Sequence, residues 1–222
     1  MPICEDIKPL VDIEDHHARL TMEVAMSYAA RRPKDLADDQ GTLTDKNGER
    51  YRLRPIRTTD APSLIRGFDA MSDQAKWFRM LNAVPHLSEE MAARFCAPDP
   101  ARDLCFVIEG HGELLGEILG GARIAGEDDG AAEFSVSLRP EAQTLGLASG
   151  ALEAILQAAH RKGINHVWGT IAVRNAPMIA LARRLGFNLL SDPDDASLIR
   201  ADIELPLSKS LVDYDYSAGR FE

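Results

Sequence analysis

The chain has 222 residues, of which 45% are hydrophobic and 27% charged, and its formal net charge at pH 7 is −10. This length suits one well-buried domain with additional segments, or at most two small domains. The acidic balance, and the lack of a Lys/Arg-rich stretch with interleaved aromatics, argue against a nucleic-acid partner. No apolar run approaches the roughly 18 residues that would cross a bilayer, so we also expect no membrane partner.

The N-terminus and the cysteines indicate the compartment. The N-terminal stretch MPICEDIKPLVDIEDHH is acidic and lacks the apolar region of a signal peptide. Cys4, Cys96 and Cys105 form no Cys-x-x-Cys pair, which argues against a disulfide framework and against a zinc ribbon. No carboxylate or cysteine recurs at a ligand spacing around a histidine, so we predict no metal site. We therefore expect a cytoplasmic protein.

The first element in chain order is a predicted helix over residues 12–32. It has acids in its first turn and Arg31 and Arg32 in its last, as the helix dipole favours, and Pro33 ends it. A polar stretch, 34–41, follows. We place an N-terminal helical extension and linker at residues 1–41, a core domain at 42–207 and a C-terminal tail at 208–222. The role of residues 1–41 is not indicated by their sequence.

The core domain begins with a predicted β-hairpin, TLTDKNGERYRLRPI, in which Gly48 supplies a positive φ. Three short helices follow, at about 60–71, 72–81 and 88–95, the last two begun by the capping serines Ser72 and Ser88. The strands DLCFVIEG, LLGEILGGARI and AAEFSVSL are predicted to form an antiparallel meander. The remaining elements are a helix at about 147–162, the strand HVWGTIAV, the helix NAPMIALARRL, and the strands FNLL and SLIRADIEL.

This order predicts the fold class. The first half reads as antiparallel strands, whereas strand, helix and strand in the second half require a right-handed crossover between parallel strands. We therefore predict an α/β (α+β) fold with a mixed, mostly antiparallel sheet, helices on both of its faces and one parallel β-α-β crossover.

The stretch SLRPEAQTLGLASGALEAILQAAHRKG has the features of a phosphate site. The first turn of a helix carries unpaired N–H groups and the positive end of the dipole, and Gly146 and Ala148 leave the approach to it open. An apolar stripe anchors this helix to the sheet, formed by Leu152, Ile155, Leu156 and Ala159. Neither the P-loop nor the dinucleotide-binding pattern is met. Small residues that serve only packing are the alternative.

The same stretch resembles a known family motif. Gln143-x-x-Gly146-x-Ala148 is similar to the acyl-CoA pyrophosphate motif Q/R-x-x-G-x-G/A of the GNAT N-acetyltransferase superfamily. Asn175, followed by Leu185-Gly186-Phe187, resembles the family's N…LGF element. The element order from about residue 42 to 205 matches as well, so the resemblance covers nearly three quarters of the chain.

The resemblance implies a GNAT fold, acetyl-CoA as acyl donor, and a set of residues that bind it. Asn175 would contact the pantetheine arm. The pyrophosphate would lie on the backbone of residues 143–149, that is, on Gln143, Leu145, Gly146, Leu147, Ala148 and Ser149. Many members have a tyrosine that protonates the leaving thiolate where this chain has Ala182, which we include among the cofactor-site positions.

Several stretches look most like the bacterial protein-lysine acetyltransferases of the Pat type: YRLRPIRTTDAPSLIRGFDAMS, HLSEEMAARF, AEFSVSL and ALARRLGF. That resemblance implies a protein substrate with an accessible lysine, such as an AMP-forming acyl-CoA synthetase. Pat-type sequences also tend to have alanine at the position of Ala182. Some relatives carry a cyclic-nucleotide domain or a synthetase-like domain, and we expect neither here.

Glu133 is the candidate catalytic residue. A lysine ammonium must lose a proton before it reacts, and Glu133 alternates with the apolar residues of its strand, so its side chain can reach a substrate groove. Where the strand loosens ahead of Pro140, main-chain N–H groups near Ser137 and Leu138 could bond the thioester oxygen and stabilise the developing oxyanion. The alternative is that Glu133 is an ordinary solvent-facing strand residue.

From the sequence we therefore expect an acetyl-CoA-dependent N-acetyltransferase that acts on a protein lysine, as a monomer or a homodimer. One alternative is acetylation of a small amine. Another is a non-catalytic regulatory domain that binds acyl-CoA without turnover.

Overall fold

The computed structural model describes residues 41–127, 130–205, 214–215 and 220–221. The predicted helix at 12–32, the rest of the extension and linker up to residue 40, and most of the tail lie outside the described residues. The predicted domain boundaries therefore stay predictions.

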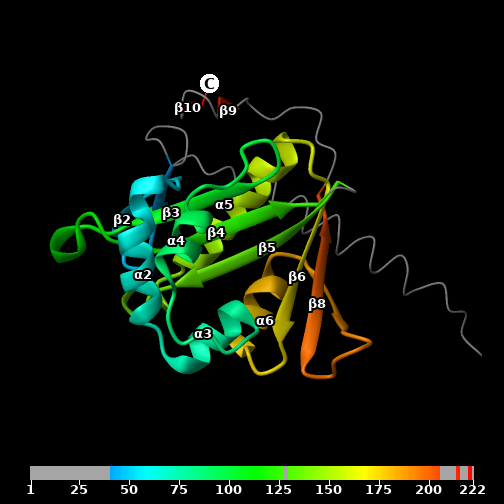
Figure 1. Cartoon of the computed structure of the whole chain (residues 1–222). Helices are drawn as coiled ribbons and strands as arrows, with labels where there is room; N and C mark the ends of the chain where they lie inside the picture. Colours follow the sequence, from blue (N-terminus) through cyan, green and yellow to red (C-terminus); the bar gives the residue numbers. More distant parts are fainter. Residues whose placement is uncertain (1–40, 128–129, 206–213, 216–219, 222) are drawn as a thin grey trace, which may run out of the picture. The chain divides into compact units, whose positions relative to one another are not determined.

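Eight strands form one sheet in the order β1-β2-β3-β4-β5-β6-β8-β7 (Figure 1). Every neighbouring pair is antiparallel except β5 and β6, which are parallel. The strands are β1 (Thr42–Thr44), β2 (Arg50–Pro55), β3 (Leu104–Glu109), β4 (Ile118–Gly126), β5 (Ala131–Leu138), β6 (His166–Ala172), β7 (Asn188–Ser191) and β8 (Leu198–Glu204). A second, two-stranded sheet pairs β9 (Tyr214–Asp215) with β10 (Arg220–Phe221).

Helices pack on both faces of the large sheet. They are α2 (Ala61–Asp69), α3 (Asp73–Met80), α4 (Glu89–Phe95), α5 (Leu147–Arg161) and α6 (Ala176–Arg184). Helix α5 connects the parallel strands β5 and β6 and packs on β3 and β4, while α2 packs on α4 and on the opposite face of β4. The predicted fold class, including the antiparallel β3-β4-β5 meander and the parallel crossover, is confirmed.

Capping side chains fix the helix starts. The hydroxyl oxygens of Ser72 and Ser88 accept main-chain hydrogen bonds at the start of α3 and α4, each at 3.2 Å. Both residues were predicted as caps, and both helices begin at the next residue. The hairpin between β1 and β2 is held in a similar way, because the buried Asp45 accepts the main-chain N–H groups of Asn47 and Glu49 at 2.8 and 2.9 Å.

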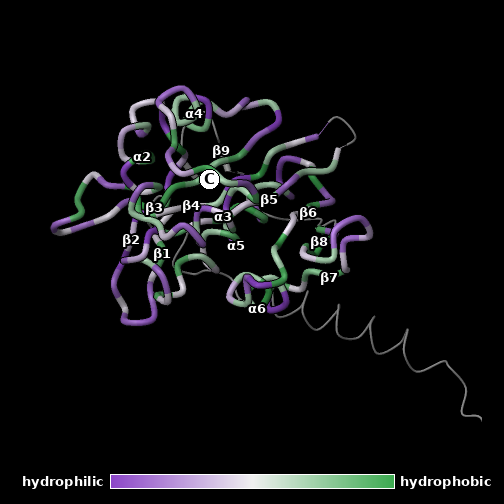
Figure 2. Tube along the Cα trace, turned by 60° about the horizontal axis from the view of Figure 1, so that its bottom comes forward, coloured by the Kyte–Doolittle hydropathy of each residue, from purple (hydrophilic) through white to green (hydrophobic). Residues whose placement is uncertain are grey.

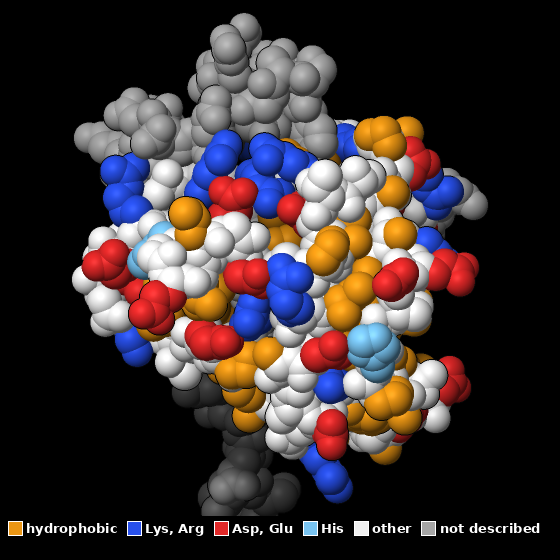
Figure 3. Space-filling model, turned by 60° about the vertical axis from the view of Figure 1, so that its left-hand side comes forward, with side chains coloured by type: hydrophobic (Ala, Val, Ile, Leu, Met, Phe, Trp, Pro, Cys, Tyr) orange, Lys and Arg blue, Asp and Glu red, His pale blue; other side chains and the backbone are white. Residues whose placement is uncertain are grey.

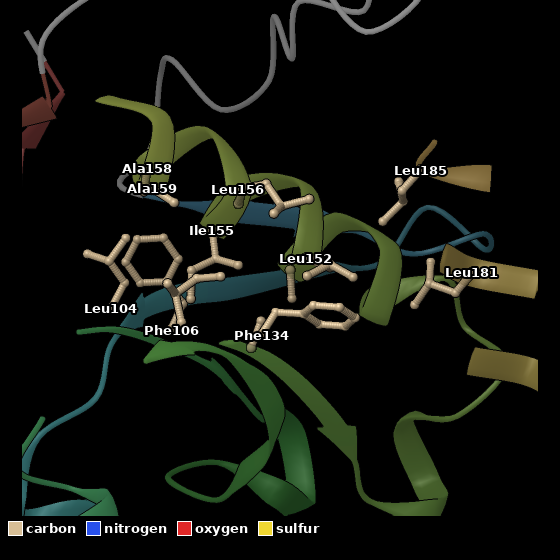
Figure 4. Close-up of a cluster of buried hydrophobic side chains, with 14 of the residues drawn as sticks. Leu104, Phe106, Phe134, Leu152, Ile155, Leu156, Ala158, Ala159, Leu181 and Leu185 are labelled. Atoms are coloured by element: carbon tan, nitrogen blue, oxygen red, sulfur yellow. The ribbon is translucent and has the colours of Figure 1, made fainter. Parts of the chain in front are cut away.

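The main hydrophobic core lies between α5 and the sheet (Figure 4). The predicted stripe of α5 is confirmed, because its members Leu152, Ile155, Leu156 and Ala159 are all 0% exposed. They meet aromatic rings from the sheet, including Phe106 and Phe134. Figure 2 shows hydrophobic segments among the central strands and mostly hydrophilic segments at the periphery. Helix α5 is thus fixed on the sheet along its whole apolar face.

We predict that Leu152→Ala lowers the free energy of unfolding by about 2–5 kcal/mol, because a fully buried leucine leaves a cavity when it is truncated. Urea unfolding followed by tryptophan fluorescence measures the change. Gln157→Ala, on the partly exposed side of the same helix, is the control and should stay within about 0.5 kcal/mol of the wild type. A loss below about 1 kcal/mol for Leu152→Ala would contradict the packing of α5.

Candidate functional site

Strands β5 and β6 separate partway along the sheet. Their parallel pairing covers only Ala131–Glu133 opposite His166–Trp168. The pairing of β5 with β4 continues to Leu138, and that of β6 with β8 continues to Ala172. Among the described residues no pair of β5 and β6 follows Glu133 and Trp168, so a gap opens in the middle of the sheet there.

The hydrogen bonds of β5 with β4 determine which main-chain groups face this gap. Just beyond the end of β5, the main-chain N–H of Arg139 donates to the carbonyl of Leu119 at 2.8 Å. At the start of β5, the carbonyl of Ala131 accepts the main-chain N–H of Glu127 at 2.8 Å. In an antiparallel pair the main-chain groups of alternate residues point to the same neighbour. The odd-numbered residues of β5 therefore bond to β4, and the even-numbered ones are directed towards β6.

Val136 and Leu138 are the even-numbered residues of β5 that lie beyond the last pair with β6. Their main-chain N–H groups therefore face the gap and are available as donors. Leu138 was predicted for this role, and Val136 was not. The main-chain N–H of Ser137, also predicted, points to β4 instead, and the Ser137 side chain lies on the face of α2 and α4.

The turn between β5 and α5 presents main-chain N–H groups. Gly146 is the N-cap of α5 with φ +88°, and Thr144 has φ +63°. Gly146 accepts the N–H of Ser149 at 3.1 Å, whereas no acceptor within the described parts of the chain bonds the N–H groups of Thr144 through Ala148. A Cβ at Gly146 would meet no atom within 4 Å, so the approach to these donors is open.

Gly150 has a different role from Gly146. A Cβ there would lie 2.8 Å from Cδ2 of Leu43, so glycine allows α5 to pack closely against β1. The turn is held from the same side, because the N–H of Lys46 bonds to the carbonyl of Leu145 at 3.1 Å. The small residues therefore serve both of the expected purposes. Gly150 allows close packing, and Gly146 leaves the approach to the N–H groups open.

A cavity of about 710 Å³ runs along the gap and reaches this turn. Its walls come from α3, β5, β6 and the start of α6, and include six predicted residues: Glu133, Ser137, Leu138, Gln143, Ala148 and Asn175. The predicted residues Leu145, Gly146, Leu147 and Ser149 belong to the adjoining turn and helix start rather than to the cavity wall. Ala182 does not line the cavity, because it is 0% exposed in the core.

Asn175 is both a helix cap and a wall residue. Its Oδ1 atom accepts the main-chain N–H of Met178 at 3.3 Å, which begins α6. The amide nitrogen of Asn175 remains as a donor on the cavity side. This gives a physical reason for an asparagine here, since aspartate would cap the helix equally well but would donate no hydrogen bond.

Glu133 stands where the gap begins, opposite Trp168 of β6. Partial burial raises the pKa of the Glu133 carboxyl above its ordinary value; the positive charges of Arg79 and Arg123 oppose this effect, and the negative charge of Glu127 adds to it. The indole Nε1 of Trp168 donates to Glu127 at 3.1 Å. Glu133 and Glu127 therefore form an acidic edge to the site.

Sequence reasoning missed Arg79, Arg174 and Trp168. Arg79 and Arg174 line the cavity, and Trp168 pairs with Glu133. Only Arg79 left a signal in the sequence, because it shares one face of α3 with Ala75 and Phe78 and so stands within an apolar stripe.

The described residues show neither a metal-binding cluster nor a membrane-spanning helix. Within the described residues, no three His, Cys, Asp or Glu side chains gather in a way that could hold a metal ion. In the same part of the chain no helix is long and apolar enough to cross a membrane. Cys96 and Cys105 are buried free thiols, and burial raises the pKa of each to about 11, which disfavours the nucleophilic thiolate.

Comparison with known proteins gives consistent matches. The family model for the acetyltransferase (GNAT) domain matches residues 50–188. Acetyltransferase PA5475 of Pseudomonas aeruginosa is 26% identical over 156 residues, which are 69% of this chain and 83% of that protein.

Solved structures share the fold. The GNAT domain of S. lividans PAT superposes with a TM-score of 0.68 at 23% identity, over 74% of this chain and 96% of that one. The PaiA N-acetyltransferase from Thermoplasma acidophilum, solved in complex with coenzyme A, gives a TM-score of 0.56 at 15% identity, over 69% of this chain and 98% of that one.

Proposed function

The chain belongs to the GNAT acetyltransferase family, and we propose that it acetylates the side-chain amine of a protein lysine with Glu133 as general base. Membership of the family makes it an enzyme that transfers an acetyl group from acetyl-CoA to an amine, with acetyl-CoA as co-substrate. The identity of the amine and the role of Glu133 are the proposal. The observation that carries it is the position of Glu133 at the point where β5 and β6 separate.

The residues at the site fit acetyl-CoA. The open N–H groups at the start of α5 suit a pyrophosphate, since the helix N-terminus favours negative charge without a lysine. In this proposal the backbone of residues 143–149 holds the pyrophosphate, and the amide of Asn175 bonds the pantetheine arm. When bound, acetyl-CoA supplies the activated acetyl group as a thioester.

The gap supplies the groups that the transfer needs. Glu133 removes a proton from the acceptor ammonium, directly or through one water, so that the amine can attack the thioester carbonyl. The raised pKa of Glu133 strengthens it as a base. The main-chain N–H groups of Val136 and Leu138 face the gap and can donate to the carbonyl oxygen as negative charge develops there.

The acidic edge favours a cationic acceptor. Glu127 is close enough to Glu133 for its negative charge to raise the pKa of Glu133, and the two carboxylates together attract an ammonium group. The long, unbranched lysine side chain suits an amine that must reach into a gap within a sheet. The resemblance of several stretches to Pat-type sequences supports a protein acceptor.

We expect a host lysate incubated with the enzyme and isotopically labelled acetyl-CoA to carry the label on lysine Nζ atoms of one or a few proteins. Mass spectrometry of the digested lysate locates the label. The Glu133→Gln protein provides the background. Label found only on small amines would overturn the lysine assignment and favour the small-amine alternative. Binding of acetyl-CoA with no transfer to any amine would favour a regulatory role.

Gly146→Glu should weaken acetyl-CoA binding at least about tenfold, because it places bulk and like charge where the pyrophosphate lies. Calorimetric titration measures the affinity. Gly163→Glu is the matched control: Gly163 follows the other end of α5, has φ +86° and is equally open, so it introduces the same backbone strain away from the site. Equal affinity of the two folded variants would remove the pyrophosphate from this turn.

Glu133→Gln should lower kcat by about 10²- to 10⁴-fold with little change in acetyl-CoA affinity, because it keeps the shape and removes the base. The wild-type rate should rise with pH as Glu133 ionises, since only the ionised carboxylate accepts a proton. The variant should lose this limb of the pH profile.

Glu127→Gln is the control for charge alone. It should keep the limb and shift it to lower pH, because the charge of Glu127 raises the pKa of Glu133. Near wild-type turnover of Glu133→Gln at neutral pH, with chemistry rate-limiting, would exclude Glu133 as the base and leave desolvation of the amine as the route.

A further inference from the structure

Arg79 of α3 is a cation at the site for which the described residues provide no hydrogen-bond or ion-pair partner. It is partly buried and lines two spaces, the 710 Å³ cavity and a smaller one of about 80 Å³ between α2, α4 and the sheet. Its guanidinium lies 5.8 Å from the centre of the Phe95 ring. Within the described part of the chain, no hydrogen bond or ion pair joins Arg79 to another residue, and Glu133 lies beyond ion-pair distance.

Three arginines near Arg79 on this side of the sheet have carboxylate partners. Arg123, which also stacks on Phe95, binds Asp103 at 2.7 Å. Glu117 binds both Arg66, at 2.6 Å, and Arg139, at 3.1 Å. Figure 3, which brings the side of α2 forward, shows Lys and Arg side chains interspersed with Asp and Glu side chains on this face.

An unpaired guanidinium in this position has a cost. Burial lowers the pKa of Arg79, which means that its surroundings disfavour the charge. Its planar group has five N–H donors, and none of them has an acceptor among the described residues. Such a group gains most from an anion that enters the cavity and accepts two parallel hydrogen bonds, as a carboxylate does.

We propose that Arg79 binds a carboxylate of the acceptor and thereby determines which amines are acetylated. This inference rests on the proposed function, because it assumes that the amine is deprotonated at Glu133. Arg79 and Glu133 are close enough to interact electrostatically, so one acceptor can place its ammonium at Glu133 and its carboxylate at Arg79. The proposed function assigns the pyrophosphate of acetyl-CoA to the start of α5, so we assign Arg79 to the acceptor.

The carboxylate has two possible sources, an acidic residue near the target lysine or the free α-carboxylate of a small amine. Two pairs of acceptors distinguish them. The first pair is a blocked lysine peptide with Glu beside the lysine and the same peptide with Gln in its place. The second pair is Nα-acetyl-lysine and its methylamide. Release of the CoA thiol gives kcat/KM for each acceptor with the full chain.

In at least one pair, the wild type should prefer the carboxylate-bearing acceptor by about tenfold or more, as expected for a charge-assisted hydrogen bond. Arg79→Gln should remove this preference while acetyl-CoA affinity stays unchanged. Arg79→Lys should keep part of it, since it retains the charge but not the planar fork. Arg94→Gln, an exposed position on α4, is the control and should keep all of it.

Thermal unfolding separates recognition from a structural role. If Arg79 serves binding, Arg79→Gln should unfold at the same or a higher temperature than the wild type, because it removes an unpaired charge. Equal wild-type kcat/KM within both pairs would overturn the inference and leave the proposed function standing, whatever the variants do. Absence of transfer to all four acceptors would count against the proposed function itself.

Discussion

The separation of β5 from β6 after Glu133 and Trp168 is the constraint on which the site depends. If the two strands stayed paired, the N–H groups of Val136 and Leu138 would be used within the sheet. The separation frees them in the middle of the sheet, where both neighbouring ladders, β4-β5 and β6-β8, hold the two edges of the gap in place. Donors that are fixed before the reaction stabilise developing charge without reorganisation, so the value of the gap lies in the rigidity of its edges.

Helix α5 contributes to the site at one end only. The apolar face of α5 is buried from Leu147 to Ala159, and the lack of a side chain at Gly150 lets the helix pack closely against β1. Its start, in contrast, is open: the N-cap Gly146 is exposed and has a positive φ, and the next residues on that side, 148–150, are partly exposed. A helix anchored along its length can leave its N-terminal donors unpaired, because the packing energy of the rest exceeds the cost of the open end.

Local patterns predicted what depends on neighbours in the sequence: the serine caps, the alternation of β5, the stripe of α5 and the glycine at its start. They did not predict features set by distant strands. Whether Ser137 or Leu138 directs its N–H into the gap depends on the register with β4. That Ala182 is buried in the core, and that Arg79 faces the cavity, depends on how α6 and α3 are rotated against the sheet. Such rotations follow from long-range packing, which no short motif contains.

Arg79 and Glu133, two of the charged groups of the site, act on each other. The positive charge of Arg79 lowers the pKa of Glu133 and so weakens it as a base, while partial burial raises that pKa. A carboxylate bound at Arg79 would oppose the lowering effect of Arg79. Towards the same ammonium, the base would then be stronger when the acceptor also carries this carboxylate than when it lacks it, so that acceptor binding and proton removal are coupled through one arginine.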